Sequence, residues 1–212
     1  MNAVLQNALR TSLILSLFAL VGTAMLAYTY RQTHGIIEKS AQEEKLALIN
    51  QVLPKHLYDN NLLDSQRELP AHALLGTRTP SAMWLATRDG EPVGVVLEAN
   101  APEGYSGDIS LLIGVDANGV LTGVRVVQHK ETPGLGDYIQ PAKSPWIFQF
   151  AGKSYDPDQD SRWKVVKDGG EFDARAGATI TPRAIVKAVR EALKYFQLHR
   201  DKLLQPIEPS KP

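Results

Sequence analysis

One uncharged run near the start of the chain sets the strongest constraint on its fold. Residues 11–30, TSLILSLFALVGTAMLAYTY, contain no charged side chain and lie between Arg10 and Arg31. A helix needs about 20 apolar residues to cross the hydrocarbon core of a bilayer. A cleaved signal peptide has a shorter apolar region, of about 7–15 residues, before a small-residue cleavage site, which this run lacks. We therefore predict a short N-terminal segment at 1–10 and a retained transmembrane helix at 11–30, and the flanking charges do not orient it.

Composition excludes several classes of function. The 23 basic and 23 acidic residues give a net charge near zero, so bulk electrostatics does not favour nucleic acid as a partner. The chain has no cysteine, which excludes disulfides, iron–sulfur clusters, thiolate metal sites and cysteine nucleophiles. Its five histidines do not pair with a candidate nucleophile in the sequence, so a hydrolase is not supported.

The remaining sequence predicts an α+β domain with an antiparallel sheet. A helical pattern at 31–54 ends at Pro54, and residues 55–80 look irregular and connective. Strand-like runs at 81–87 and 92–100 flank Asp89-Gly90, a pair that accepts the positive φ angles of a tight hairpin turn. A second hairpin is predicted from 108–115 and 120–129. A closing helix completes a domain at 81–200, followed by a tail at 201–212.

Two threonines stand where the closing helix begins, in the stretch AGATITPRAIVKAV at 176–189. Thr181 is predicted to cap the helix with Pro182 at the first helical position. Thr179 then has no structural role, while Gly177 and Ala178 remove bulk beside the positive end of the helix dipole. These residues fit either an anion site or an ordinary tight turn, and the physics of the segment leaves both open.

A family resemblance bears on that choice. The segment KDGGEFDARAGATITPRAIVKAVREAL resembles the FMN-binding domain of the G subunit of Rnf (Rsx) ion-translocating complexes and of the C subunit of sodium-translocating NADH:quinone reductases. The stretches EKLALINQVLP and KETPGLGD extend the resemblance over nearly the whole chain and favour the Rnf member of the pair. In this family a flavin transferase reads D-x-x-[ST]-G-A-T and esterifies the threonine with FMN. The pattern falls on residues 173–179, with Ala176 where serine or threonine is usual.

The resemblance implies a set of cofactor-binding residues. Thr179 would carry the covalent FMN through a phosphoester, with Asp173, Gly177, Ala178 and Thr181 around it. The loop KETPGLGD would pack against the flavin through its backbone, although on its residues alone it is equally a plain connection. A metal site formed by His129, Glu131 and Asp137 is the less favoured alternative, because such residues are common in loops by chance. The remaining expected pocket residues are Thr132, Pro133, Gly134, Leu135, Gly136, Tyr105, Ser106 and Lys167.

The tryptophans and the overall role complete the expectations. Trp84, Trp146 and Trp163 are expected in the core or at its rim rather than against the flavin. The resemblance implies an electron carrier on the periplasmic side of the inner membrane, in contact with other Rnf subunits and, during maturation, with a flavin transferase. The chain itself would turn over no substrate. An unflavinylated structural subunit and a membrane-anchored ligand-binding or sensor domain remain alternatives.

Overall fold

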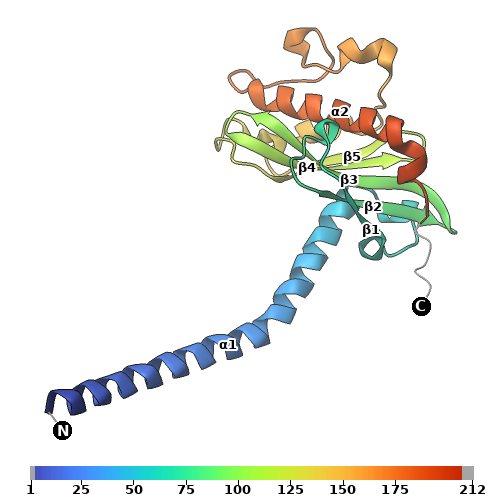
Figure 1. Cartoon of the computed structure of the whole chain (residues 1–212). Coiled ribbons are helices and arrows are strands. Elements are labelled where there is room, and N and C mark those ends of the chain that lie inside the picture. Colours follow the sequence, from blue (N-terminus) through green and yellow to red (C-terminus); the bar gives the residue numbers. More distant parts are fainter. Residues whose placement is uncertain (1–2, 207–212) are drawn as a thin grey trace. The chain divides into compact units, whose positions relative to one another are not determined.

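The structure is a computed structural model and describes residues 3–206, so residues 207–212 of the predicted tail lie outside it. The chain divides into two compact units, Met1–Lys45 and Leu46–Pro212. Two long helices, α1 and α2, and five strands form the regular elements (Figure 1).

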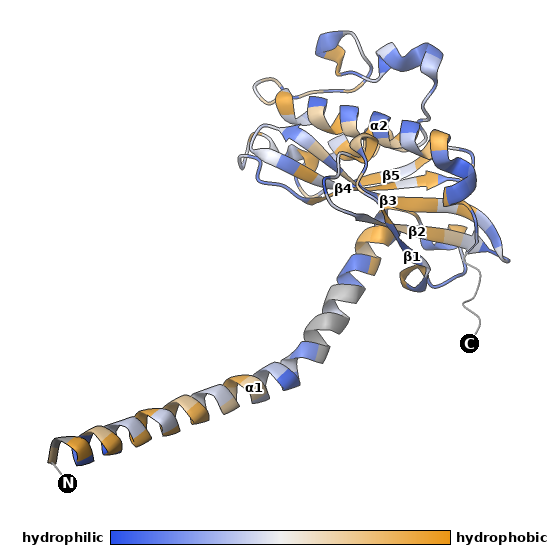
Figure 2. Ribbon diagram, viewed as in Figure 1, coloured by the Kyte–Doolittle hydropathy of each residue, from blue (hydrophilic) through white to orange (hydrophobic). Residues whose placement is uncertain are grey.

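The helix α1, Ala3–Val52, joins the predicted anchor and the predicted juxtamembrane helix without a break. Its part Leu5–His34 is, within residues 3–206, the one helix that is long and apolar enough to cross a membrane. Figure 2 shows hydrophobic residues along this first part. The hydroxyls of Thr23 and Thr29 donate hydrogen bonds to carbonyls one turn back, at 2.8 and 2.9 Å. These bonds satisfy polar atoms that a lipid environment would otherwise leave unpaired.

The sheet is an antiparallel meander in which each strand pairs with the next in sequence. Asp89 and Gly90 turn with φ angles of 53° and 82°, as the first predicted hairpin requires. The predicted α+β class and both hairpins are confirmed. The four-residue strand β1 lies in the region predicted to be irregular, because QREL is too short and polar to show a strand pattern. The strands are β1 Gln66–Leu69, β2 Ser81–Arg88, β3 Glu91–Gly104, β4 Gly107–Asp116 and β5 Leu121–Gln128.

Both faces of the sheet are covered. The helix α2, Ile180–Leu203, lies across one face (Figure 1) and contributes Ile185, Val189, Ala192 and Phe196 to the core, as its sequence period predicts. It continues three residues into the predicted tail. Side chains that alternate along the strands, such as Trp84 in β2, reach the other face, where the end of α1 packs.

The end of α1 contacts the sheet at two glycines, Gly114 and Gly123, which we call the glycine window. Gly114 on β4 and Gly123 on β5 are directly paired across the sheet. A Cβ added to Gly114 would lie 2.5 Å from the Val52 carbonyl oxygen, and one added to Gly123 would lie 3.0 Å from the Val52 Cα. The Thr122 hydroxyl donates a hydrogen bond of 2.5 Å to the same carbonyl. The absent side chains therefore let helix backbone rest directly on the sheet.

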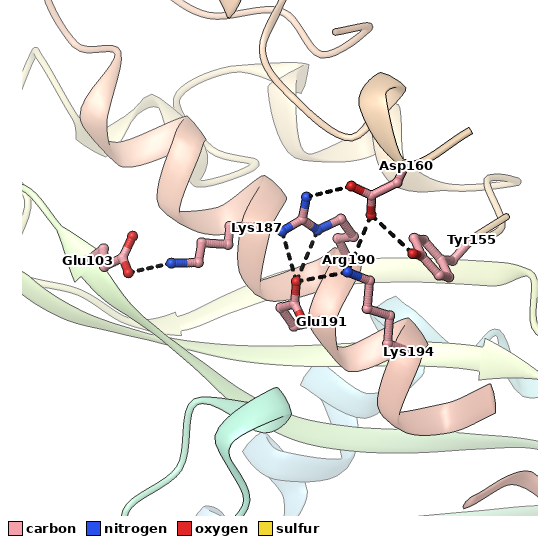
Figure 3. Close-up of polar contacts among 7 residues, drawn as sticks. All are labelled: Glu103, Tyr155, Asp160, Lys187, Arg190, Glu191 and Lys194. Carbon is pink, nitrogen blue, oxygen red and sulfur yellow. Dashed lines mark hydrogen bonds and ion pairs between the residues drawn. The ribbon is translucent and has the colours of Figure 1, made fainter. Parts of the chain in front are cut away.

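A long segment that contains several short 3₁₀ helices links β5 to α2. Ion pairs join this segment to side chains of α2. Asp160 is the centre of these contacts in Figure 3: it lies 3.2 Å from Arg190 Nη1 and 3.3 Å from Lys194 Nζ. Tyr155 donates a hydrogen bond of 3.0 Å to the same carboxylate. These contacts therefore join the segment to the middle of α2. Its helices are η4 Asp137–Ile139, η5 Pro145–Phe150, η6 Pro157–Arg162 and η7 Val166–Asp168.

Candidate functional site

A cavity of about 350 Å³ lies where three distant segments meet at the start of α2. One segment is the turn between β3 and β4, another is the loop after β5, and the third leads directly into α2. The sequence predicts that each of these segments contributes to a pocket. The lining residues are Tyr105, Glu131, Thr132, Leu135, Gly136, Gly177, Ala178, Thr179, Ile180 and Thr181.

The structure places neither threonine at the helix entrance in a capping role. Thr179, not Thr181, stands at the N-cap position, and it has αR backbone angles and no side-chain capping bond. Its side chain is half-buried, and its hydroxyl makes no hydrogen bond to another described residue. The first amides of α2 have no partner within the helix and give this end a partial positive charge. Thr179 therefore presents a free hydroxyl to the cavity at a point suited to an anion.

Thr181 is engaged elsewhere, and the prediction that it caps the helix is wrong. It lies inside α2, is 1% exposed, and donates a hydrogen bond of 2.5 Å to Glu131 Oε2. The second oxygen of Glu131 accepts a hydrogen bond of 3.0 Å from the Ser106 amide. Glu131 thus joins the start of α2 to the β3–β4 turn and is the main contributor that the sequence did not predict in this role. The carboxylates of the loop KETPGLGD indicated that it could accept hydrogen bonds. The residue that donates to Glu131, however, lies 50 positions away in the sequence.

The loop at 132–136 is closed by its own hydrogen bonds. The amides of Leu135 and Gly136 both donate to the Thr132 carbonyl, at 3.1 and 3.0 Å, and the Gly134 amide donates to Asp137 Oδ1 at 2.8 Å. Gly134 has a φ of 80°, which favours glycine at this turn. The loop therefore offers the cavity the flat backbone of Gly136 and the exposed side chain of Leu135, not three unpaired amides.

The segment before Thr179 is fixed by aromatic residues. Tyr138 accepts a hydrogen bond of 3.2 Å from the Arg175 amide, and its hydroxyl lies 3.4 Å from the Ala178 carbonyl. Burial raises the pKa of Tyr138, although the hydrogen bond and charge of Arg175 oppose the shift, so the phenol stays protonated. Trp146 Nε1 donates a hydrogen bond of 2.6 Å to the Asp173 carbonyl. The side chains of Tyr138 and Trp146 thus hold residues 173–178 against the domain through hydrogen bonds.

Several predicted residues do not line the cavity. Asp173 lines a different cavity, beside Trp146, and Lys167 lies in η7. Ser106 contributes only its amide, through Glu131. Of the loop after β5, Pro133 and Gly134 are exposed and outside the lining. All three tryptophans are buried in the core, as expected.

The predicted alternative of a metal site does not gain support from the geometry. Glu131 is used by Thr181 and Ser106, Asp137 accepts from Gly134, and His129 Nδ1 accepts from the Glu131 amide at 3.0 Å. Within residues 3–206 no three His, Asp or Glu side chains converge in a way that could hold a metal ion.

Comparisons with known proteins match both parts of the chain. Residues 104–194 match the family described as FMN-binding domain, and residues 1–52 match the RnfG N-terminal region. The G subunit of the ion-translocating oxidoreductase complex of Pseudomonas aeruginosa PAO1 is 49% identical over 203 residues, which cover 96% of this chain and 95% of the relative. The chain belongs to this family of G subunits. The corresponding protein of Aliivibrio fischeri MJ11 is 43% identical over 92% of this chain and 93% of its own.

The matched FMN-binding domain includes every residue that lines the cavity. Among solved structures, that of NqrC from Shewanella oneidensis has a TM-score of 0.48 and 24% identity, and covers 70% of this chain and 72% of that chain. The family models and the relatives confirm the G-subunit family that the sequence motifs predicted.

Proposed function

We propose that this chain is a membrane-anchored flavoprotein subunit of an ion-translocating oxidoreductase complex, with FMN attached to Thr179 through a phosphoester. The flavin passes electrons between neighbouring subunits of the complex. The observation that carries the proposal is the Thr179 hydroxyl, which has no hydrogen bond among the described residues and lines the cavity at the positive end of α2.

The lining fits the two ends of FMN. The N-terminus of α2 suits a phosphate, since its unpaired amides and dipole favour negative charge. Around the same cavity stand three exposed apolar side chains, Tyr105, Leu135 and Ile180, which are 68%, 52% and 46% exposed. Exposed apolar groups that converge on one cavity are typical of a site for a flat aromatic ligand. When bound, FMN supplies the redox chemistry, and the protein supplies attachment, orientation and electrostatics.

Attachment requires an activated donor, because an alcohol and a free phosphate do not condense in water. A flavin dinucleotide is such a donor. Its pyrophosphate bond breaks as the bond from Thr179 Oγ1 to the FMN phosphorus forms, the nucleoside monophosphate leaves, and the hydroxyl proton is released. Thr179 is suited to this reaction because its hydroxyl is free, whereas that of Thr181 is buried against Glu131. A flavin transferase would catalyse the step.

The anchor and the family resemblance support the following proposed setting. The part of α1 at Leu5–His34 spans the inner membrane once, with the N-terminus in the cytoplasm and the flavin domain in the periplasm. The partners are the other subunits of the Rnf complex. A covalent tether suits this location, since a cofactor held by a phosphoester is retained whatever its redox state.

One feature favours a second candidate, an unflavinylated structural subunit of the same complex. Ala176 occupies the pattern position that usually carries a hydroxyl, and it is exposed, so a transferase could contact it directly. A transferase that requires this hydroxyl would modify the chain slowly or leave it unmodified.

The deciding experiment is intact mass and in-gel fluorescence of the denatured full-length protein, co-expressed with a flavin transferase and exported. Wild type should carry one FMN, and Thr179→Ala none. Thr132→Ala is the matched control, because Thr132 is an exposed threonine that lines the same cavity, and it should be modified like wild type. If the wild-type protein has the mass of the unmodified chain, the proposal is wrong. Modification of Ala176→Ser alone would then support the structural subunit.

A further inference from the structure

Glu131 is an unusual lining residue for a flavin site. Its side chain is 4% exposed and faces the cavity that we assign to FMN. A carboxylate is a poor neighbour for the FMN phosphate, because like charges repel. Its presence in the lining therefore requires a role other than binding the phosphate.

In the described residues the Glu131 carboxylate is held by hydrogen bonds rather than by an ion pair. Both of its oxygens accept hydrogen bonds, one from the Ser106 amide at 3.0 Å and one from the Thr181 hydroxyl at 2.5 Å. Two donors on two oxygens suit an ionised carboxylate, which accepts only. No ion pair joins Glu131 to a cation in the part of the chain that the structure describes. Its charge is therefore opposed by the partial positive charge at the start of α2, where Thr181 lies, and not by a paired cationic side chain.

Two glycines form walls around this carboxylate. A Cβ added to Gly136 would lie 2.7 Å from Glu131 Oε2, and one added to Gly104 would lie 3.0 Å from Oε1. Backbone thus encloses the group from the loop after β5 and from the end of β3. A side chain enclosed in this way keeps one position, so its charge acts at a fixed point on the cavity.

We propose that Glu131 is a positioning residue: its carboxylate places a fixed negative charge beside the flavin cavity and so lowers the reduction potential of the bound flavin. The inference rests on the proposed function, because it needs FMN in this cavity. Reduction adds electrons to the flavin, and a fixed negative charge nearby opposes that addition by Coulomb repulsion, which is weakly screened in a partly buried site. Removal of the charge should favour the reduced flavin.

The test is a spectroelectrochemical titration of the full-length flavinylated protein in detergent, followed at the flavin absorbance. Glu131→Gln keeps the size of the side chain and removes its charge. At a fixed poise we expect its ratio of reduced to oxidised flavin to rise about tenfold, an upward shift of about 30 mV for a two-electron couple. Asp137→Asn is the control: Asp137 is also buried in this loop, but it does not line the cavity and its carboxylate is paired with Lys143 at 3.8 Å, so its shift should be smaller.

A second variant separates charge from structure. Glu131→Asp keeps the charge but shortens the side chain and so weakens both hydrogen bonds. If charge sets the potential, Glu131→Asp should lie nearer wild type than Glu131→Gln does. A merely structural role predicts the reverse, because Glu131→Gln preserves the shape better.

The outcomes distinguish this inference from the proposed function. Equal potentials in flavinylated wild type and Glu131→Gln would overturn the inference and leave the flavin site intact. The inference also fails if Glu131→Gln and Glu131→Ala take up no flavin while Glu131→Asp does, since the carboxylate would then serve attachment. A wild type without flavin would overturn both proposals.

Discussion

The glycine window under the end of α1 allows a quantitative test of how the domain holds its helix. In Gly114→Ala the new Cβ would collide with Thr122 Oγ1 and would lie 2.5 Å from the Val52 carbonyl oxygen. Cβ atoms do not approach other heavy atoms this closely, so the helix end must move away from the sheet. The movement breaks the hydrogen bond from Thr122 to Val52.

The expected cost combines two terms. Insertion of a methyl group into a packed interface costs about 1–3 kcal/mol, and loss of one hydrogen bond costs about 0.5–1.5 kcal/mol. We expect the free energy of unfolding of Gly114→Ala to fall by about 2–3 kcal/mol. In Gly123→Ala the nearest atoms, all helix backbone, lie at 3.0–3.3 Å, so a smaller loss of about 1–2 kcal/mol is expected.

Urea unfolding of the detergent-solubilised full chain, followed by tryptophan fluorescence, measures both losses. Trp84 is fully buried on the face where α1 packs, so its emission reports on this interface. Gly22→Ala in α1 is the control, because its added Cβ meets nothing within 4 Å.

A double-mutant cycle tests the cause of the loss. Thr122→Ala removes both the nearest clashing atom and the hydrogen bond that the clash breaks. The loss in the double variant Gly114→Ala/Thr122→Ala should therefore be smaller than the sum of the two single losses by about 1 kcal/mol. Unchanged stability of Gly114→Ala, or strict additivity in the cycle, would refute the account of the window.

Three other expectations concern the segment that leads to Thr179 and its anchors. Burial raises the pKa of Asp160, but hydrogen bonds from Tyr155 and Lys194 and the charges of Arg190 and Lys194 outweigh it, so the net pKa lies below its usual value. The stability from this depressed pKa is present above about pH 4 and is lost as pH falls through the folded-state value. Asp160→Asn should therefore lose less stability between pH 7 and pH 3 than wild type does, as measured by urea midpoints. Trp146→Phe removes the bond to the Asp173 carbonyl and part of a buried ring, and should cost at least about 1 kcal/mol, with faster amide exchange at 173–178. Thr179→Ala should change the free energy of unfolding by less than about 0.5 kcal/mol, since its hydroxyl has no partner to lose.

Features encoded by neighbouring residues were predictable from the sequence. The Asp-Gly pair fixed the first hairpin through its backbone angles, and the 3.6-residue period of α2 identified its buried face. The apolar run predicted the long first helix. Each of these signals depends on residues within a few positions of one another, where stereochemistry and periodicity decide the outcome.

Features that depend on distant pairing were not predictable. The strand β1 forms because its backbone pairs with the edge of β2, not because the sequence QREL favours a strand. The glycines at 114 and 123 carry no local signal of their role. Their pairing across the sheet, and the helix backbone that they admit, exist only once β4 and β5 are in register.

The two threonines show the same limit at the site itself. Local rules favour a threonine before proline as a cap, and on those rules Thr181 is the structural residue and Thr179 is left over. The distinction between the two holds, but its cause differs, because Thr181 is occupied by a carboxylate from a loop 50 positions earlier. The family pattern points to Thr179 as the proposed acceptor without this information, and the contact with Glu131 supplies a physical reason why the hydroxyl of Thr181 is not free.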